Sequence, residues 1–238
     1  MKKIILFVLM VCPLLIFGQT DKVKIYGTVS DYEGNPIDSA NVMLLDQSFQ
    51  PLHQSVSDEN GNYSMEVPKG NYYAMAVLNR NHYGKTRLEY WAWSVPAQED
   101  IQINPRYHKM EVYALNAFRP QGAHPSYMIY FRPMSLTKSL NSSGNKKDMD
   151  VTPDLEKSEI KVEINDENVD IYTIQKVKEY VEKKSGESDF VYGYIIQTSL
   201  PENFEDNYQR FRVVVKDKET GDKGEATYYL FNKNYETK

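Results

Sequence analysis

Two tryptophans separated by one residue are the side chains in this sequence best suited to hold a ligand. Trp91 and Trp93 are the only tryptophans in the chain. Alternate residues of a β-strand share a face, so a strand here places both indoles side by side. Rigid flat rings on a sheet give a platform on which the C–H face of a sugar ring can stack. We therefore predict a ligand-binding set of Tyr90, Trp91, Trp93 and Arg87.

The same pair has a second interpretation, because large aromatic side chains usually fill a core or the seam between two domains. The sequence favours a strand over residues 85–93 with Arg87 and Glu89 on the tryptophan face, and these charges favour exposure. Exposure of the indoles would support a binding role, and burial would support a structural one.

Other residue types with reactive side chains form no recognisable catalytic or metal-binding pattern. The four histidines lack metal-ligand spacing, and the SDENGN turn at 57–62 lacks the glycine and distal glutamate of an EF-hand loop. No serine stands in a G-x-S-x-G elbow, and Cys12 is the only cysteine. The sequence thus predicts a non-enzymatic protein without metal or cofactor. A hydrolase is the remaining alternative, which a pocket joining two carboxylates or several histidines would favour.

Composition restricts the partners. The formal net charge is -5 and no basic stripe is present, which argues against nucleic acid. Hydrophobic residues make up 41% and charged residues 26%, as expected of a chain that buries a core.

The amino terminus is typical of a secretory signal peptide. Two lysines precede an apolar run that ends at Phe17, and Gly18 is followed by polar residues. The run is too short for a stable membrane span. We predict a signal peptide at 1–18, no integral span in the mature chain, and a location in the periplasm, at the cell surface or outside the cell. Lipidation at Cys12 is disfavoured because Val11 is not small.

Residues 22–105 are predicted to form a β-sandwich. Apolar residues alternate over 23–29, a near-continuous apolar run spans 40–45, and a more polar run over 51–56 indicates an edge strand. The turns EGNP, SDENGN and PKGN separate these runs. The triplet at 38–40, Asp-Ser-Ala, matches a short acceptor pattern and makes Ser39 a candidate for O-glycosylation.

Seventeen residues of this region follow one ordered pattern. They are Ile25, Gly27, Val29, Asp31, Gly34, Pro36, Ile37, Ala40, Val42, Ser57, Asp58, Gly61, Tyr63, Val67, Pro68, Gly70 and Tyr72. The pattern resembles the carboxypeptidase regulatory-like (transthyretin-like, prealbumin-like) domain. The resemblance implies a seven-stranded Greek-key sandwich of the carbohydrate-binding-like fold group. Such domains accompany metallocarboxypeptidases and outer-membrane transporters of Bacteroidetes-like bacteria, and we recognise neither neighbour in this sequence.

Residues 106–238 are predicted to form a second, immunoglobulin-like β-sandwich. Its strands are inferred from alternation and turn spacing alone. A polar stretch at 138–153 is expected to be a mobile loop. Residues 171–184 fit either a helix or a strand, and the strand is favoured because the surroundings are all β.

The sequence as a whole therefore predicts an all-β protein of two tandem β-sandwiches behind a cleaved signal peptide. We expect an exported envelope protein that binds a glycan or a protein partner. The alternative is a structural spacer or assembly module of an envelope complex.

Overall fold

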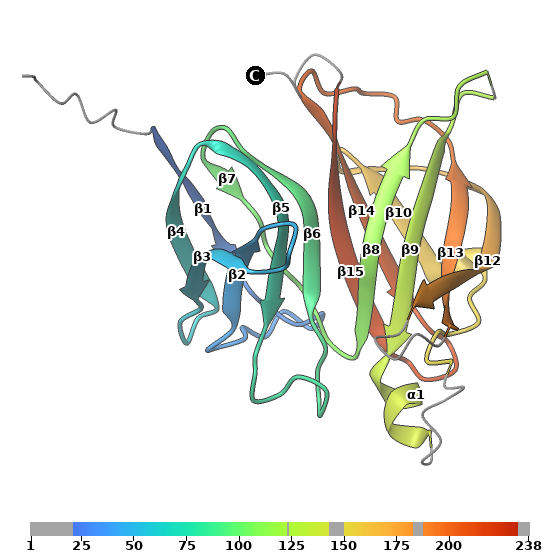
Figure 1. Ribbon diagram of the computed structural model, residues 1–238, viewed down its shortest axis with the longest axis horizontal. Coiled ribbons are helices and arrows are strands. Elements are labelled where there is room, and N and C mark those ends of the chain that lie inside the picture. Colours follow the sequence, from blue (N-terminus) through green and yellow to red (C-terminus); the bar gives the residue numbers. More distant parts are fainter. Residues whose placement is uncertain (1–20, 123, 143–149, 183–187, 233–238) are drawn as a thin grey trace, which may run out of the picture.

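The computed structural model describes residues 21–122, 124–142, 150–182 and 188–232. The described chain is nearly all β and forms two tandem sandwiches, as predicted (Figure 1). The predicted signal peptide lies outside the described residues. No helix among the residues described has the length and apolarity needed to cross a membrane.

The first sandwich consists of a three-stranded and a four-stranded layer. Its strands are β1 (Lys22–Thr28), β2 (Asn41–Leu45), β3 (Pro51–Val56), β4 (Asn62–Pro68), β5 (Gly70–Leu78), β6 (Tyr90–Ala97) and β7 (Ile101–Gln102). The layers are ordered β4-β1-β7 and β6-β5-β2-β3. The alternation of apolar and polar residues predicted for β1 matches its burial. Val23 and Ile25 face the core, while Lys22 and Lys24 face solvent. Strand β3 is at the edge, as predicted.

The second sandwich packs two four-stranded layers together. Its strands are β8 (Met110–Phe118), β9 (Tyr127–Ser135), β10 (Ile160–Ile164), β11 (Glu167–Asn168), β12 (Ile171–Glu182), β13 (Ser188–Thr198), β14 (Tyr208–Lys216) and β15 (Lys223–Phe231). They are ordered β12-β13-β9-β8 and β11-β10-β14-β15. The short helices are α1 (Leu136–Asn141) and η1 (Lys157–Glu159).

The two sandwiches share one continuous sheet of eight strands. Strand β6 pairs in parallel with β15, so that Trp91 lies beside Ala226 and Trp93 beside Tyr228. The sheet order is therefore β11-β10-β14-β15-β6-β5-β2-β3. The pairing of β6 with β15 was not predicted from the sequence. The domain boundary near residue 105 stays a prediction.

The shared sheet is covered on opposite faces in its two halves. The β4-β1-β7 layer covers one face of the first half, where Tyr90, Ala92 and Tyr229 join the first core. The β12-β13-β9-β8 layer covers the other face of the second half, where Trp91 and Trp93 join the second core. This offset leaves two inside corners, one beside β7 and one beside β8.

Two local predictions require correction. The strand predicted over 85–93 begins only at Tyr90, because the preceding residues form turns around Gly84, which has φ +70°. The mobile loop predicted over 138–153 begins inside helix α1, whose first turn is capped by Ser135 accepting from Lys138 N. Residues 143–149 of that stretch lie outside the description.

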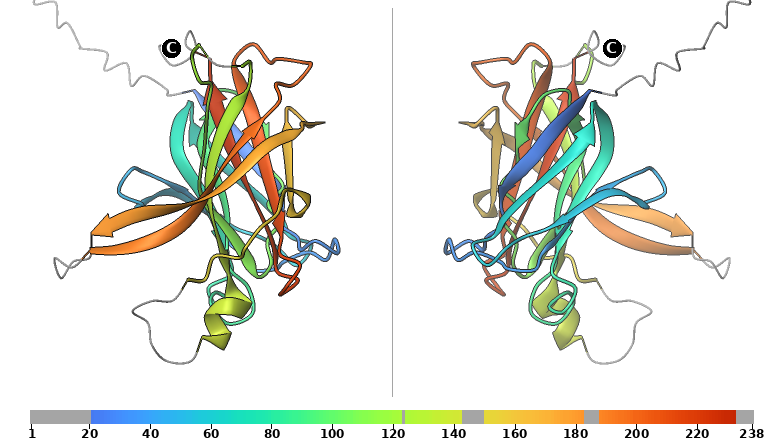
Figure 2. Two further views of the ribbon diagram at one scale, coloured as in Figure 1. Left: turned by 90° about the vertical axis from the view of Figure 1, so that its right-hand side faces the viewer. Right: turned by 90° about the vertical axis from the view of Figure 1, so that its left-hand side faces the viewer.

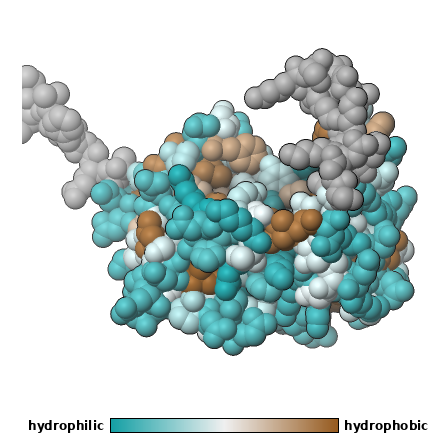
Figure 3. Space-filling view, turned by 90° about the horizontal axis from the view of Figure 1, so that it is seen from below, coloured by the Kyte–Doolittle hydropathy of each residue, from teal (hydrophilic) through white to brown (hydrophobic). Residues whose placement is uncertain are grey.

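The ambiguous segment over 171–184 forms strand β12 across Ile171–Glu182, which confirms the favoured interpretation. Its partner β13 pairs with β9 only over residues 194–198, so the rest of the β12–β13 hairpin has no third strand beside it. Figure 2 shows this hairpin projecting from the body in both views. At the end that carries α1, Figure 3 shows a mostly hydrophilic surface with small, separate apolar patches.

Candidate binding sites at the inside corners of the shared sheet

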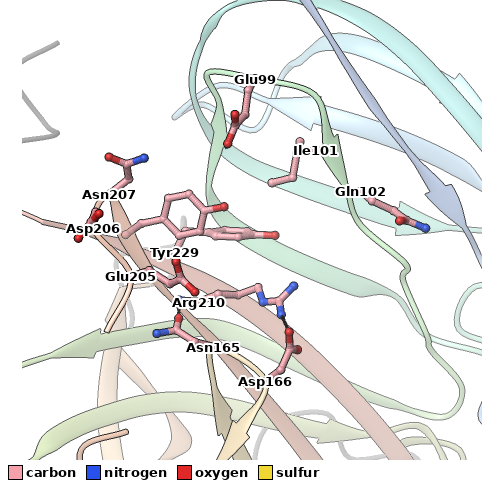
Figure 4. A pocket seen from close by; sticks show the side chains of 11 residues that line it. Glu99, Ile101, Gln102, Asn165, Asp166, Glu205, Asp206, Asn207, Arg210 and Tyr229 are labelled. Atoms are coloured by element: carbon pink, nitrogen blue, oxygen red, sulfur yellow. Dashed lines mark hydrogen bonds and ion pairs between the residues drawn. The ribbon is translucent and has the colours of Figure 1, made fainter. Parts of the chain in front are cut away.

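The corner beside β7 holds a cleft of about 390 Å³, which we call the acidic cleft. Its lining residues come from both sandwiches (Figure 4): Glu99, Ile101, Gln102, Asn165, Asp166, Glu205, Asp206, Asn207, Tyr208, Arg210 and Tyr229. A concave space of this size at an interface between sandwiches is a common setting for a ligand.

One wall of the acidic cleft is built by the turn that joins β10 to β11. This two-residue turn places Asn165 and Asp166 at positive φ, as a tight hairpin of this type requires. Asn165 is then fixed, because its Nδ2 donates to Gln209 Oε1 at 2.6 Å and its Oδ1 accepts from Arg210 N at 2.9 Å. Asp166 is left to pair with Arg210.

A second wall is the loop before β14. Gln209 is buried, and its Nε2 donates to Glu205 O at 2.7 Å. Asn232 Nδ2 donates to the carbonyls of Glu205 and Asp206 at 3.0 Å and 2.7 Å. The loop backbone is thus held by Gln209 of β14 and by Asn232, which follows β15. The side chains of Glu205 and Asp206 remain exposed.

The floor and charge of the cleft define what it can bind. Tyr208 and Tyr229 meet edge to face, with ring centroids 5.3 Å apart. Four carboxylates and one guanidinium line the space, and the guanidinium of Arg210 is ion-paired to Asp166. The remaining excess of negative charge disfavours an anionic ligand.

The corner beside β8 is filled by five rings, which we call the aromatic corner: Phe49, Tyr73, Trp91, Trp93 and Tyr113. The two indoles stack with centroids 5.0 Å apart and an interplanar angle of 14°. Tyr113 from β8 meets both edge to face at 5.2 and 5.3 Å. The predicted side-by-side arrangement of the indoles is therefore present, but each indole is only 7% exposed.

A pair of acidic side chains adjoins the aromatic corner. Trp91 Nε1 donates to Glu111 Oε1 at 2.9 Å. Burial raises the pKa of Glu111 well above its ordinary value, and the nearby Glu89 raises it further. Burial also raises the pKa of Glu89. The hydrogen bond between the two carboxyls raises the pKa of Glu111 and lowers that of Glu89, so Glu111 is the one that holds the proton.

Residues 24–103 match the family model for the carboxypeptidase regulatory-like domain. They cover β1 to β7 almost completely. This part of the chain is a carboxypeptidase regulatory-like domain. The matched segment supplies β7 to the acidic cleft and β6 to the aromatic corner, while the rest of the chain supplies the opposite wall of each.

Solved structures similar to the chain include two proteins of the DUF3823 family and a pilin. The protein from Parabacteroides merdae is 10% identical, with 88% of this chain and 98% of that chain covered and a TM-score of 0.26. The one from Bacteroides ovatus is 9% identical, with 87% and 99% covered and a TM-score of 0.27. The major pilin subunit BcpA of Bacillus cereus is 8% identical, with 89% and 69% covered and a TM-score of 0.29. No curated protein matches the chain.

The structure separates the residues predicted to bind a ligand. Trp91 and Trp93 share one face of β6 in the regulatory-like domain, whereas Tyr90 is on the opposite face and donates to Thr227 Oγ1 at 2.8 Å. Arg87 precedes the strand, and its guanidinium lies 3.7 Å from Asp31 Oδ2. Ligand binding by this set stays a prediction, but the set does not form one open platform, because the indoles are covered and Arg87 is outside the strand.

The acidic cleft was missed by sequence reasoning. Its residues are drawn from three separate parts of the chain, around positions 99–102, 165–166 and 205–229. A local signal for one wall is the Asn-Asp pair at 165–166, a residue type suited to the tight turn that follows β10. Ser39, the candidate for O-glycosylation in the regulatory-like domain, is exposed and has φ +55°. Within the described residues, no group of three or more His, Cys, Asp or Glu is placed to hold a metal ion.

Proposed function

We propose that this protein is a non-enzymatic, exported binding module that holds an uncharged carbohydrate in the acidic cleft. The observation that carries the proposal is the combination of the half-buried Tyr208 ring with carboxylate and amide side chains in one cleft between the two sandwiches. Carboxylates accept hydrogen bonds from hydroxyl groups, and amides both accept from them and donate to them. A tyrosine ring offers an apolar face.

The negative charge of the cleft favours neutral carbohydrates over anionic ones. Glu99, Glu205 and Asp206 are exposed carboxylates. Arg210, the cation among the lining residues, is ion-paired to Asp166 instead. A sulfated or uronic-acid sugar would bring like charge to this surface, which costs free energy. Neutral hexose and pentose polymers, which carry no such charge, are therefore the favoured ligands.

Binding is tested by titrating the protein from residue 19 onward with neutral oligosaccharides of glucose, mannose, xylose and arabinose, using calorimetry. Heparin and alginate serve as anionic comparisons. The double variant Glu205→Gln, Asp206→Asn keeps side-chain size but changes the hydrogen-bonding groups. We expect it to weaken binding by about fivefold or more, as when charge-assisted hydrogen bonds are lost. Glu66→Gln, an exposed change on β4 outside the cleft, should bind as the parent does.

Three results would count against the proposal: that no neutral oligosaccharide binds, that the double variant binds as tightly as the parent, or that heparin binds better than the neutral sugars. Because the cleft joins several carboxylates, the same samples are assayed for new reducing ends. Hydrolysis of a bound polymer would replace the binding role with that of a glycoside hydrolase.

A structural role is the second candidate, and two observations favour it. The tryptophan pair is buried, and the shared sheet joins the two sandwiches through backbone hydrogen bonds. A spacer of this kind should behave as one rigid body in solution. Small-angle scattering checks this, and a profile that requires two independently moving sandwiches would contradict it.

Export is part of the proposal. The predicted signal peptide at 1–18 and cleavage after Gly18 are tested by amino-terminal sequencing of protein secreted by a bacterial host. The periplasm, the cell surface and the medium are separated by fractionation.

Mass spectrometry of the same material tests O-glycosylation of Ser39. A glycan on this side chain adds a hexose-containing mass, which a Ser39→Ala variant should lack.

A further inference from the structure

Phe49 stands in a backbone conformation that a phenylalanine rarely adopts. It lies in the turn between β2 and β3 with φ +59°, a region in which glycine or asparagine is usual. The turn is otherwise well bonded, since Asp46 Oδ1 accepts from Ser48 N at 2.8 Å and from Gln50 N at 2.9 Å. The unfavourable conformation is thus confined to the residue that carries the ring.

The ring of Phe49 covers the tryptophan pair. Its centroid is 6.0 Å from that of Trp91 and 6.3 Å from that of Trp93, at interplanar angles near 90°. Tyr73 flanks it at 5.6 Å. Phe49 is itself 40% exposed while each indole is 7% exposed. Tyr73 is also 40% exposed and meets Trp93 edge to face at 5.8 Å. Of these two solvent-facing rings, Phe49 is the one that meets both indoles.

The covered pair contains a hydrogen-bond donor without an acceptor. Trp93 Nε1 is buried and has no hydrogen-bond partner among the described residues, whereas Trp91 Nε1 is bonded to Glu111. A buried donor in this condition is uncommon and costs stability. The strained cover and the residue with the unpaired donor both belong to the aromatic corner.

We propose that the Trp91–Trp93 pair is a second carbohydrate site, closed by Phe49, and that a pyranose ring binds when Phe49 swings aside. The apolar face of the sugar replaces the Phe49 ring on the indoles, and a sugar hydroxyl accepts from Trp93 Nε1. Moving Phe49 also releases its backbone from positive φ. This site is on the opposite face of the shared sheet from the acidic cleft, and it does not depend on the cleft binding anything.

The test uses the two tryptophans as their own reporters, because they are the only ones in the chain. Phe49→Gly removes the ring and suits the positive φ, so the turn is kept. We expect its tryptophan emission to shift to longer wavelength and to be quenched more strongly by iodide. Leu52→Ala removes a side chain that is 52% exposed on the same hairpin and should leave both readings unchanged.

Binding is then measured by titrating cellohexaose, xylohexaose and mannohexaose against tryptophan emission. If Phe49 keeps the site mostly closed, Phe49→Gly binds about fivefold or more tightly than the parent, because affinity is reduced by the fraction of open molecules. Trp93→Phe in the Phe49→Gly background should lose most of the gain while remaining folded by circular dichroism. The cleft variant Glu205→Gln, Asp206→Asn should leave the emission response intact.

Two outcomes would overturn the proposal. In one, Phe49→Gly leaves iodide quenching unchanged, which means that Phe49 is not the cover. In the other, quenching rises but no hexasaccharide changes the emission, which means that the uncovered pair does not take a sugar. A response abolished by the cleft variant assigns the binding to the acidic cleft instead.

Discussion

Trp91 Nε1 donates a hydrogen bond of 2.9 Å to Glu111 Oε1 and thereby joins β6 of the first sandwich to β8 of the second. The acceptor is buried and close to Glu89, so that one contact ties the packing of the two sandwiches to the protonation of a carboxyl group.

Replacing Glu111 by glutamine should stabilise the protein at alkaline pH. The pKa of Glu111 is raised in the folded state, so its contribution is full below the unfolded pKa of about 4.3 and is lost as pH rises toward the folded value. Glutamine keeps an acceptor for Trp91 and has no charge to bury. We expect the free energy of unfolding of Glu111→Gln to exceed that of the parent by about 1 kcal/mol or more at pH 8.

Urea denaturation at pH 5 and pH 8 measures this difference. The advantage of Glu111→Gln should shrink at pH 5, because the raised pKa of the parent carboxyl favours its neutral form as pH falls. The exposed change Glu66→Gln should show no such trend. An advantage that is equal at both pH values would show that Glu111 does not titrate as inferred.

A methyl group at Gly224 should disrupt the contact between β15 and β8. A Cβ at this position would lie 2.1 Å from Met110 O, which is backbone and has little room to move. Gly224→Ala should therefore lower the free energy of unfolding by about 2 kcal/mol or more. Gly70→Ala is the matched control, because a Cβ there meets nothing within 4 Å, and its effect should stay within about 0.5 kcal/mol. Equal stabilities of the two variants would refute the close approach.

The ion pair between Arg106 and Glu225 should hold the linker against the shared sheet. Arg106 Nη2 lies 2.8 Å from Glu225 Oε2, and the Glu225 side chain is 3% exposed. Removing one partner of a buried pair costs about 3–5 kcal/mol, and we expect about 2 kcal/mol for Arg106→Met because the Arg106 side chain is 35% exposed.

Thermal melts of Arg106→Met followed by near- and far-ultraviolet circular dichroism test this coupling. Both signals should change in one transition at a lower temperature, since the sandwiches share a sheet. The double variant Arg106→Met, Glu225→Gln should recover part of the loss, because no buried carboxylate is left uncompensated. Two separate transitions in the parent would argue that the sandwiches fold independently.

Asp222 should anchor helix α1. Its carboxylate is buried and accepts from Ser135 Oγ at 2.6 Å, from Thr137 N at 3.0 Å and from Thr137 Oγ1 at 2.7 Å. Asp222→Ala leaves these donors unpaired and should cost about 2–3 kcal/mol. Glu219→Gln removes an exposed partner of Lys138 and should cost under about 1 kcal/mol. Urea denaturation compares the two, and similar losses would mean that the buried network contributes little.

Local features of the fold were readable from the sequence. The turn at Gly61, with φ +76°, and the alternation around Val23 and Ile25 were predicted from residue type and spacing, because steric limits on φ and the two-residue strand period act over a few residues. The start of β6 was misplaced, since the run from 85 to 89 alternates like a strand while its backbone is bent by turns.

The sequence by itself determined that the chain is all β, that residues 24–103 match the regulatory-like domain, and that two tryptophans stand side by side. Only the tertiary structure decided that β6 pairs with β15, that the tryptophans are covered, and that carboxylates distant in the chain line one cleft. The reason is physical. Local patterns specify which face of a strand is apolar, whereas burial and charge at a site depend on which distant strand or loop lies against it, and that is set by the packing of the whole chain.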